Sequence, residues 1–324
     1  MNNKTLCEFW AASSVKDGGA YLFRLCADET LEQIRKIPMD APKYLELNGK
    51  HMWAVLMDPF EGSKESGIMC VDTESGETVG EILPTFGRSV CHLAVDGEDV
   101  YAANYSTGNL VRLPEQVIQH TGTGPDPDRQ TCPHVHGTFL SPDKKYLLVC
   151  DLGLDAVFTY TRDLQLVSRA QTPPGAGPRH LCFSACGKYV YTVNEMGASV
   201  SVFAYADGIL TLLDTVSILP GGEFGYGAGS AIKLSPDGTR LYATERVTQT
   251  IATLAVNGKD VQLIASTDSH GKEPRDFTLL ADGKYAVSTN QFADVMALFR
   301  IDENGVPVYV RSYDLPAPLC AIEC

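Results

Sequence analysis

Histidine, arginine and serine recur at one position of a repeated sequence unit, and such side chains suit the binding of an anion and the transfer of a proton. The residue seven positions before the turn of a unit is His136, Arg179, Ser230 or Arg275. Arginine binds a carboxylate or phosphate through paired hydrogen bonds, and histidine exchanges a proton near neutral pH. We therefore predict that Arg179 and Arg275 clamp an anion and that His136 takes part in proton transfer.

A second group of polar residues follows the same turns, at the far end of the next strand. Nine residues after the turn come Glu195, Arg246 and Gln291, and eight residues after it come Asp151 and Asn194. Because both ends of a hairpin lie at one edge of a sheet, both groups are expected at one mouth of a central channel. Glu195 is predicted to be a general acid or base. The residues predicted to bind substrate are His134, Asp151, Asn194, Arg246 and Gln291.

A structural role is the alternative for each of these side chains. Arg179 and Arg275 would then pair with carboxylates of the repeats, and His136 would be an ordinary loop histidine. Glu195 would pair with one of these arginines. His134 and His136 also form an H-x-H pair, but no third ligand is identifiable by spacing, so no metal is predicted. Four other histidines are expected to be structural, namely His92, His120, His180 and His270.

These positions belong to a unit that occurs six times with a period of about 45 residues, in the range of four-stranded propeller blades. Each copy contains two apolar runs joined by a turn, and two further strand-like runs precede the next copy. Helical periodicity of useful length appears nowhere. The copies cover 43–58, 92–105, 136–151, 179–195, 230–246 and 275–291.

The two ends of the chain supply a seventh unit. Residues 6–13, 20–26 and 30–38 predict three strands, and residues 319–324 predict the innermost one. Mixing both ends in one blade removes an open sheet edge. We therefore predict an all-β fold, a seven-bladed β-propeller whose last blade is closed by the N- and C-terminal strands. Residues 1–324 would form this single domain, with six blades as the lesser alternative.

Two segments interrupt the repeat, each before the first strand of a unit. Residues 114–133 predict a long polar loop, and residues 217–229 predict a glycine-rich one. Loops on one face of a rigid scaffold often carry function. The glycine-rich run 225–231 leads into a strand, so it is not the start of a phosphate-binding helix.

The amino-acid composition and net charge limit the classes of molecule that the protein is expected to bind. The 324 residues carry a net charge of −14 and a pI of about 4.9, which argues against nucleic acid and anionic membranes. No signal-peptide pattern opens the chain and no apolar run approaches the roughly 18 residues of a membrane helix, so a cytoplasmic protein is expected. The ten cysteines are scattered, and we expect them to be reduced, buried and structural. A monomer or weak homo-oligomer is expected.

The order and spacing of these motifs resemble the propeller-type lactonase family, which includes the seven-bladed bacterial 6-phosphogluconolactonases and the fungal carboxy-cis,cis-muconate cyclase. The segments that carry the resemblance are 91–110, 122–157, 175–203, 230–246 and 273–291. In that family a histidine, a glutamate and two arginines are proposed to form the site. The resemblance places these roles on His136, Glu195, Arg179 and Arg275. The first blade departs from the family pattern.

The expected function is hydrolysis of an anionic sugar lactone, most specifically 6-phosphogluconolactone in the pentose phosphate pathway. The arginines would bind the anion and polarise the carbonyl, and Glu195 or His136 would activate water. An activated ester needs neither a cofactor nor a covalent nucleophile. Two alternatives stay open: cycloisomerisation of a muconate, and a propeller that binds other proteins without catalysis.

Overall fold

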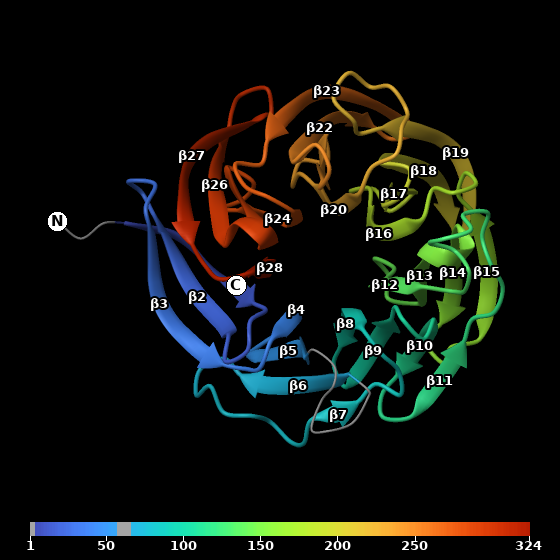
Figure 1. Ribbon diagram of the computed structural model, residues 1–324, viewed down its shortest axis with the longest axis horizontal. Coiled ribbons are helices and arrows are strands. Elements are labelled where there is room, and N and C mark those ends of the chain that lie inside the picture. Colours follow the sequence, from blue (N-terminus) through green and yellow to red (C-terminus); the bar gives the residue numbers. More distant parts are fainter. Residues whose placement is uncertain (1–3, 57–65) are drawn as a thin grey trace.

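The computed structural model describes residues 4–56 and 66–324, which form seven antiparallel four-stranded sheets around a central axis (Figure 1). The innermost strands are β4 (Pro42–Asn48), β8 (Val90–Asp96), β12 (Val135–Leu140), β16 (Pro178–Phe183), β20 (Gly229–Leu234), β24 (Pro274–Leu280) and β28 (Pro318–Glu323). The second strands are β5 (His51–Leu56), β9 (Asp99–Asn104), β13 (Tyr146–Asp151), β17 (Tyr189–Asn194), β21 (Arg240–Glu245), β25 (Tyr285–Asn290) and β1 (Thr5–Ser13).

The outer half of each blade is built from the remaining strands. The third strands are β6 (Gly67–Asp72), β10 (Asn109–Arg112), β14 (Ala156–Thr161), β18 (Ser199–Ala206), β22 (Thr250–Asn257), β26 (Val295–Ile301) and β2 (Gly19–Cys26). The outermost strands are β7 (Leu83–Pro84), β11 (Gln116–Gln119), β15 (Leu166–Gln171), β19 (Ile209–Ser217), β23 (Asp260–Asp268), β27 (Pro307–Asp314) and β3 (Leu31–Pro38). Two short 3₁₀ turns follow second strands, η1 (Leu152–Leu154) and η2 (Gln291–Ala293).

Both ends of the chain share one sheet, with the strand order β28-β1-β2-β3. Ala11 pairs with Ala321 and Trp10 with Ile322, so the last strand is the inner partner of the first. The predicted seven blades and their closure by both chain ends are confirmed, and six blades are excluded. The strands expected from the sequence begin and end within a residue or two of the observed ones, except that the last two residues of the copy 43–58 lie outside the described residues.

Apolar side chains fill the space between neighbouring blades, and buried tyrosines add hydrogen bonds from one blade to the next. Tyr191 on β17 and Tyr242 on β21 occupy equivalent strand positions and are almost fully buried. Tyr191 donates its hydroxyl hydrogen bond to the carbonyl of Gly258 at 2.7 Å, and Tyr242 donates to that of Gly305 at 2.8 Å. Each acceptor lies in an outer turn of the next blade. A buried tyrosine needs such a partner, and the pairing fixes one blade against the next.

Two sequence expectations need correction. The segment 114–133 is not loop throughout, because β11 lies in it and pairs with β10 through Val117 and Val111. The ten cysteines are all free, but only four of them are buried, namely Cys26, Cys70, Cys150 and Cys320. Four others are half-buried, and Cys186 and Cys324 are exposed. Cys186 lies in the turn between β16 and β17, and Cys324 follows the last strand, so neither faces a core.

Candidate active site

A break in strand pairing near the start of the inner strands directs side chains toward the axis. In six of the seven inner strands the pairing skips the second residue, and in β20 it skips two, Ser230 and Ala231. A bulge of this kind leaves a residue unpaired and re-aims its side chain. The residues skipped in the six strands are Lys43, Cys91, His136, Arg179, Arg275 and Leu319.

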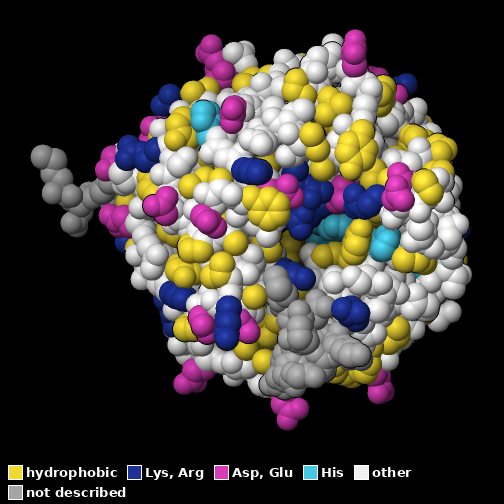
Figure 2. Space-filling view, viewed as in Figure 1, with side chains coloured by type: hydrophobic (Ala, Val, Ile, Leu, Met, Phe, Trp, Pro, Cys, Tyr) yellow, Lys and Arg dark blue, Asp and Glu magenta, His cyan; other side chains and the backbone are white. Residues whose placement is uncertain are grey.

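A cavity of about 440 Å³ opens at this end of the axis. Figure 2 shows dark-blue Lys and Arg side chains around a central hollow, with histidine inside it. Members of both groups predicted from the repeat meet here, because the inner strands begin and the second strands end at the same edge. His136, Arg275, Glu195, Arg246 and Gln291 line this cavity, whereas Arg179 lines a smaller one that adjoins it. The polar side chains that line the cavity are Lys43, Ser89, Cys91, Tyr105, Arg129, His136, Glu195, Arg246, Arg275 and Gln291.

Glu195, which directly follows β17, is surrounded by cationic and polar groups. Its Oε1 accepts a hydrogen bond from Arg129 Nη2 at 2.8 Å. Its Oε2 lies 3.1 Å from Arg246 Nη2 and 3.4 Å from Arg179 Nε. His136 Nε2 lies 3.9 Å from the same oxygen. Burial opposes the charge on Glu195, but Arg246 and Arg179, with the Arg129 hydrogen bond, hold the pKa of this carboxyl well below its usual range.

A second carboxylate, Glu273, pairs with the other side of the arginine group. Its Oε1 lies 2.9 Å from Arg246 Nη1 and 3.5 Å from Arg275 Nη1. Arg246 therefore bridges Glu195 and Glu273. The four arginines Arg129, Arg179, Arg246 and Arg275 outnumber the two glutamates. The site is locally positive although the whole chain carries a net charge of −14.

His136 lies at the base of the cavity and is buried. Gly137, the next residue, has no side chain, and a Cβ there would stand 2.6 Å from the carbonyl oxygen of Arg179. The glycine thus permits the close approach of β12 and β16 that brings His136 beside Arg179. Burial, followed by the Arg179 charge, holds the pKa of His136 well below its usual value. The imidazole is therefore neutral at physiological pH and able to accept a proton.

The rings of two further histidines continue from His136 along the axis. His180 lies 5.3 Å from His136 between ring centroids, and His92 lies 4.8 Å from His180. Burial and then Arg179 lower the pKa of His180, and burial and then Lys233 lower that of His92. All three imidazoles are therefore uncharged in the folded protein near neutral pH.

Three residues predicted to bind substrate do not reach the cavity. Asp151 is fully buried, and its carboxylate accepts hydrogen bonds from His120 Nδ1 at 2.6 Å and from the backbone N–H of His134 at 2.9 Å. Asn194 is also fully buried, and its Nδ2 donates to Ser201 Oγ at 2.8 Å. Neither offers an exposed atom to a ligand, so their assignment to substrate binding is corrected.

His134 likewise does not line the cavity. Its ring stacks on Tyr105 with centroids 4.3 Å apart, and its Nδ1 lies 3.0 Å from the Tyr105 carbonyl oxygen. It supports Tyr105, which lines the cavity, and it does not converge with His136 on a shared ligand position. Within residues 4–56 and 66–324, no group of three or more His, Cys, Asp or Glu side chains is placed to hold a metal ion.

Lining residues that the sequence prediction missed fall into two kinds. Tyr105 follows β9 as Glu195 follows β17, and Lys43 occupies the bulge position of β4, so the repeat register contained a signal for both. Arg129 lies in the irregular part of the segment 114–133, where no register applies. The neighbouring Gln130 anchors that segment by donating to the Leu152 carbonyl at 2.8 Å.

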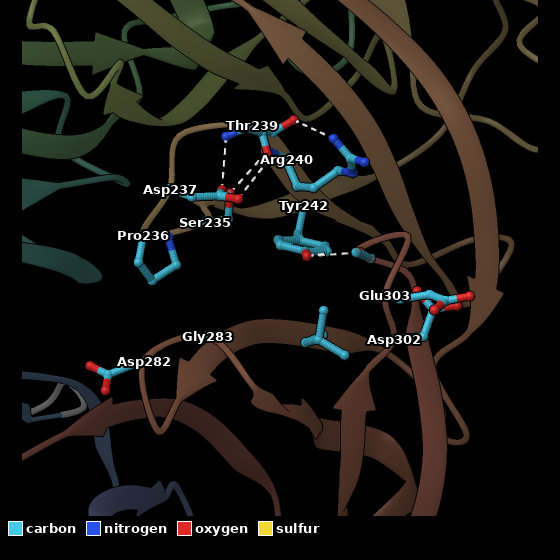
Figure 3. Close-up of a pocket in the computed structure, with 12 residues that line it drawn as sticks. Ser235, Pro236, Asp237, Thr239, Arg240, Tyr242, Asp282, Gly283, Asp302 and Glu303 are labelled. Atoms are coloured by element: carbon cyan, nitrogen blue, oxygen red, sulfur yellow. Dashed lines mark hydrogen bonds between the residues drawn. The ribbon is translucent and has the colours of Figure 1, made fainter.

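A different hollow of about 280 Å³ lies between two blades at the opposite ends of their strands (Figure 3). Asp237 at its edge already accepts hydrogen bonds from Ser235 Oγ at 2.5 Å and from the backbone N–H of Thr239 at 3.0 Å. None of the residues predicted to carry chemistry lines this hollow. The candidate site is therefore the cavity around Glu195.

The fold and this cavity define a seven-bladed propeller with a cation-rich site at one mouth. Residues 10–322 match the family described as lactonase, 7-bladed beta-propeller. The chain belongs to this lactonase family. No helix among the described residues is long and apolar enough to span a membrane.

Similar proteins extend over nearly the whole chain. An uncharacterised protein of Lactococcus lactis is 32% identical over 300 residues, which is 86% of each chain. The 6-phosphogluconolactonase of Bacillus subtilis is 27% identical over 326 residues, which is 93% of each chain. The solved structure of the periplasmic gluconolactonase of Pseudomonas aeruginosa is 26% identical, covers 98% of each chain and superposes with a TM-score of 0.88.

Proposed function

We propose that the protein hydrolyses an anionic sugar lactone, with 6-phospho-D-glucono-1,5-lactone as the substrate. The observation that carries this proposal is the excess of arginine around Glu195 and His136 in one cavity. The name of the Bacillus subtilis relative supports the phosphorylated lactone. A cytoplasmic location and a step of the pentose phosphate pathway belong to the same proposal, as does a monomer or weak homo-oligomer.

His136 is the better candidate for the general base. Both oxygens of Glu195 are occupied by arginines, whereas no described residue lies within hydrogen-bonding distance of His136 Nε2. In this proposal a water molecule between the two groups loses a proton to His136 and attacks the lactone carbonyl. Glu195 orients the water and stabilises the imidazolium that forms. Proton transfer of this kind contributes roughly 10²–10⁴-fold to the rate.

The arginines stabilise the negative charge that develops on the carbonyl oxygen. Arg179 is the best placed, because its Nε lies 3.4 Å from Glu195 Oε2 and its charge acts on His136. One such donor contributes about 3–4 kcal/mol. When the tetrahedral intermediate collapses, the ring oxygen leaves and takes the proton from His136. The product is the open-chain acid, which ionises to a carboxylate.

The test is to follow hydrolysis of 6-phosphogluconolactone against its spontaneous rate. Arg179→Met and Glu195→Gln should each lower kcat/KM by more than 100-fold. Arg311→Met is the matched control, because Arg311 is exposed on the outermost strand β27 and should keep the wild-type rate. Wild-type rates in both site variants would refute the assignment. A carboxymuconate assayed in parallel tests cycloisomerisation, since arginine also binds carboxylates.

A further inference from the structure

A smaller cavity of about 70 Å³ continues inward from the candidate active site. All six bulge residues line it, together with Tyr44, His180 and Asp276. The two cavities share Lys43, Cys91, His136, Arg275 and Leu319. A water molecule occupies about 30 Å³ of liquid, so this inner pocket has room for a group of a few heavy atoms and excludes a sugar ring.

The inner pocket holds more positive than negative charge. Lys43, Arg179 and Arg275 line it from three blades, and Asp276 is the acidic residue that lines it. Asp276 Oδ1 accepts the backbone N–H of Phe277 at 2.9 Å, and its Oδ2 accepts that of Ala321 at 3.1 Å. Asp276 Oδ1 also lies 3.9 Å from Lys233 Nζ, so the negative charge of this carboxylate is offset by a lysine that does not line the pocket.

Arg179 is incompletely satisfied. It is buried, with 6% of its surface exposed, and its Nε makes no hydrogen bond to any described residue, although it lies 3.4 Å from Glu195 Oε2. Its Nη1 donates to the carbonyl of Ser230 at 2.9 Å. Burial and then the nearby Arg275 charge lower the pKa of Arg179 to about 10. Buried cations normally have close counter-charges and hydrogen-bond partners. Among the described residues, Arg179 has only this long ion pair through Nε and stands beside the positive charge of Arg275, so the pocket favours additional negative charge.

We infer that the inner pocket binds the phosphate group of the substrate and that the lactone ring lies in the outer cavity, facing Glu195 and His136. This inference rests on the proposed function. The substrate then enters phosphate first. Arg179 stands at the junction, where it contacts both the phosphate and the reacting carbonyl, while Lys43 and Arg275 contact the phosphate alone. A phosphate pocket apart from the ring site would favour a phosphorylated lactone over an unphosphorylated gluconolactone, the kind of substrate in the name of the Pseudomonas aeruginosa protein.

The first measurement compares two substrates in the full chain. Wild type should prefer 6-phosphogluconolactone over glucono-1,5-lactone in kcat/KM. Arg275→Met and Lys43→Met should each reduce that preference at least tenfold, chiefly through a higher KM for the phosphorylated lactone. Arg311→Met should leave the preference unchanged. An equal loss on both lactones in both pocket variants would overturn the inference while leaving the lactonase proposal in place.

The second measurement does not depend on catalysis. Calorimetric titration with inorganic phosphate should show binding to wild type and to Arg311→Met, and at least tenfold weaker binding to Arg275→Met and Lys43→Met. Thermal unfolding curves establish that each variant is folded. If neither lactone is hydrolysed, the proposed function fails, but this binding pattern still supports a phosphate pocket. Absence of binding, or equal binding in all four proteins, overturns it.

Discussion

Arg129 Nη2 donates a hydrogen bond to Glu195 Oε1 at 2.8 Å, although 66 residues separate the two in the chain. Arg129 comes from the segment that interrupts the repeat, whereas Glu195 occupies a repeat position. The contact therefore joins the variable part of the molecule to its regular part at the point proposed for chemistry. Arg129 is also more exposed than the other partners of Glu195, with 38% of its side chain accessible.

Arg129→Met should reduce kcat/KM about tenfold, because Glu195 loses one of its oriented hydrogen bonds, and tenfold corresponds to about 1.4 kcal/mol. The remaining cations still hold the carboxyl in its ionised form, so the pH profile should keep its shape. Arg129→Lys should recover part of the rate. A loss beyond 1000-fold would instead assign Arg129 a direct role in the reaction.

Glu195→Gln should destabilise the fold by about 3 kcal/mol, because it leaves a group of buried cations without their shared counter-charge. The midpoint of urea unfolding, compared with that of Arg311→Met, measures the change. Added sulfate should restore part of the loss by supplying negative charge. An unchanged midpoint would show that the arginines do not depend on this carboxylate in the folded state.

Three histidines with lowered pKa values predict a loss of stability in mild acid. The pKa values of His92, His136 and His180 are lowered in the folded state, so below about pH 6.5 the unfolded chain binds protons that the native state does not. Their contribution is complete above that pH and is lost as the pH falls. Glu46 acts in the opposite direction, because burial raises its pKa to about 7.

His180→Gln isolates one of these contributions. Between pH 6.5 and 5.5, the slope of unfolding free energy against pH should fall by up to about 1.4 kcal/mol per pH unit relative to wild type. Urea titrations at several pH values give both slopes. Parallel curves for the two proteins would mean that His180 is not held neutral in the native state.

The pH dependence of catalysis should also follow from lowered pKa values in the candidate site. Since the pKa values of His136 and Glu195 both lie below their usual ranges, both groups are unprotonated at neutral pH. After subtraction of the spontaneous reaction, kcat/KM should stay level from pH 8 to 6.5 and fall only in more acidic solution. A fall centred at or above pH 6.5 would mean that a group with an ordinary histidine pKa controls the reaction.

Cys186 should be alkylated first among the cysteines. It is exposed, and its hydrogen bond with Ser184 lowers the pKa of its thiol. By contrast, burial raises the pKa of Cys91 in the candidate site to about 12, so that thiol stays protonated. Mass spectrometry after brief iodoacetamide treatment at pH 7.5 gives the order. Faster modification of Cys91 than of Cys186 would contradict these environments.

The repeat register was sufficient to predict the architecture and much of the site. Side chains at equivalent positions of successive blades must meet around one axis, so His136, Arg179 and Arg275 could be grouped without coordinates. Asp151 and Asn194 were misplaced because successive residues of a strand point to opposite faces. Asn194 is one residue before Glu195, and that single step sends its side chain into the blade.

The irregular segment could not be predicted in the same way. Arg129 is positioned by specific hydrogen bonds, including one from its own backbone N–H to Asp126 Oδ1 at 2.8 Å. Such contacts follow no period, and loops adopt them through local turn chemistry. The inner pocket could not be predicted from the sequence either. Its walls depend on the breaks in strand pairing, and no residue pattern indicates where those breaks occur.

The pairing of β28 with β1 also affects the order in which the blades form during synthesis. Six blades are continuous in sequence and can form as the ribosome releases them, but the remaining sheet needs residues near 5 and near 323 at the same time. Until β28 has been synthesised, β1 has no inner neighbour in its sheet, and the ring of seven blades is not closed. During that interval the inner edge of β1 is an unpaired strand edge of the kind that promotes association with other chains.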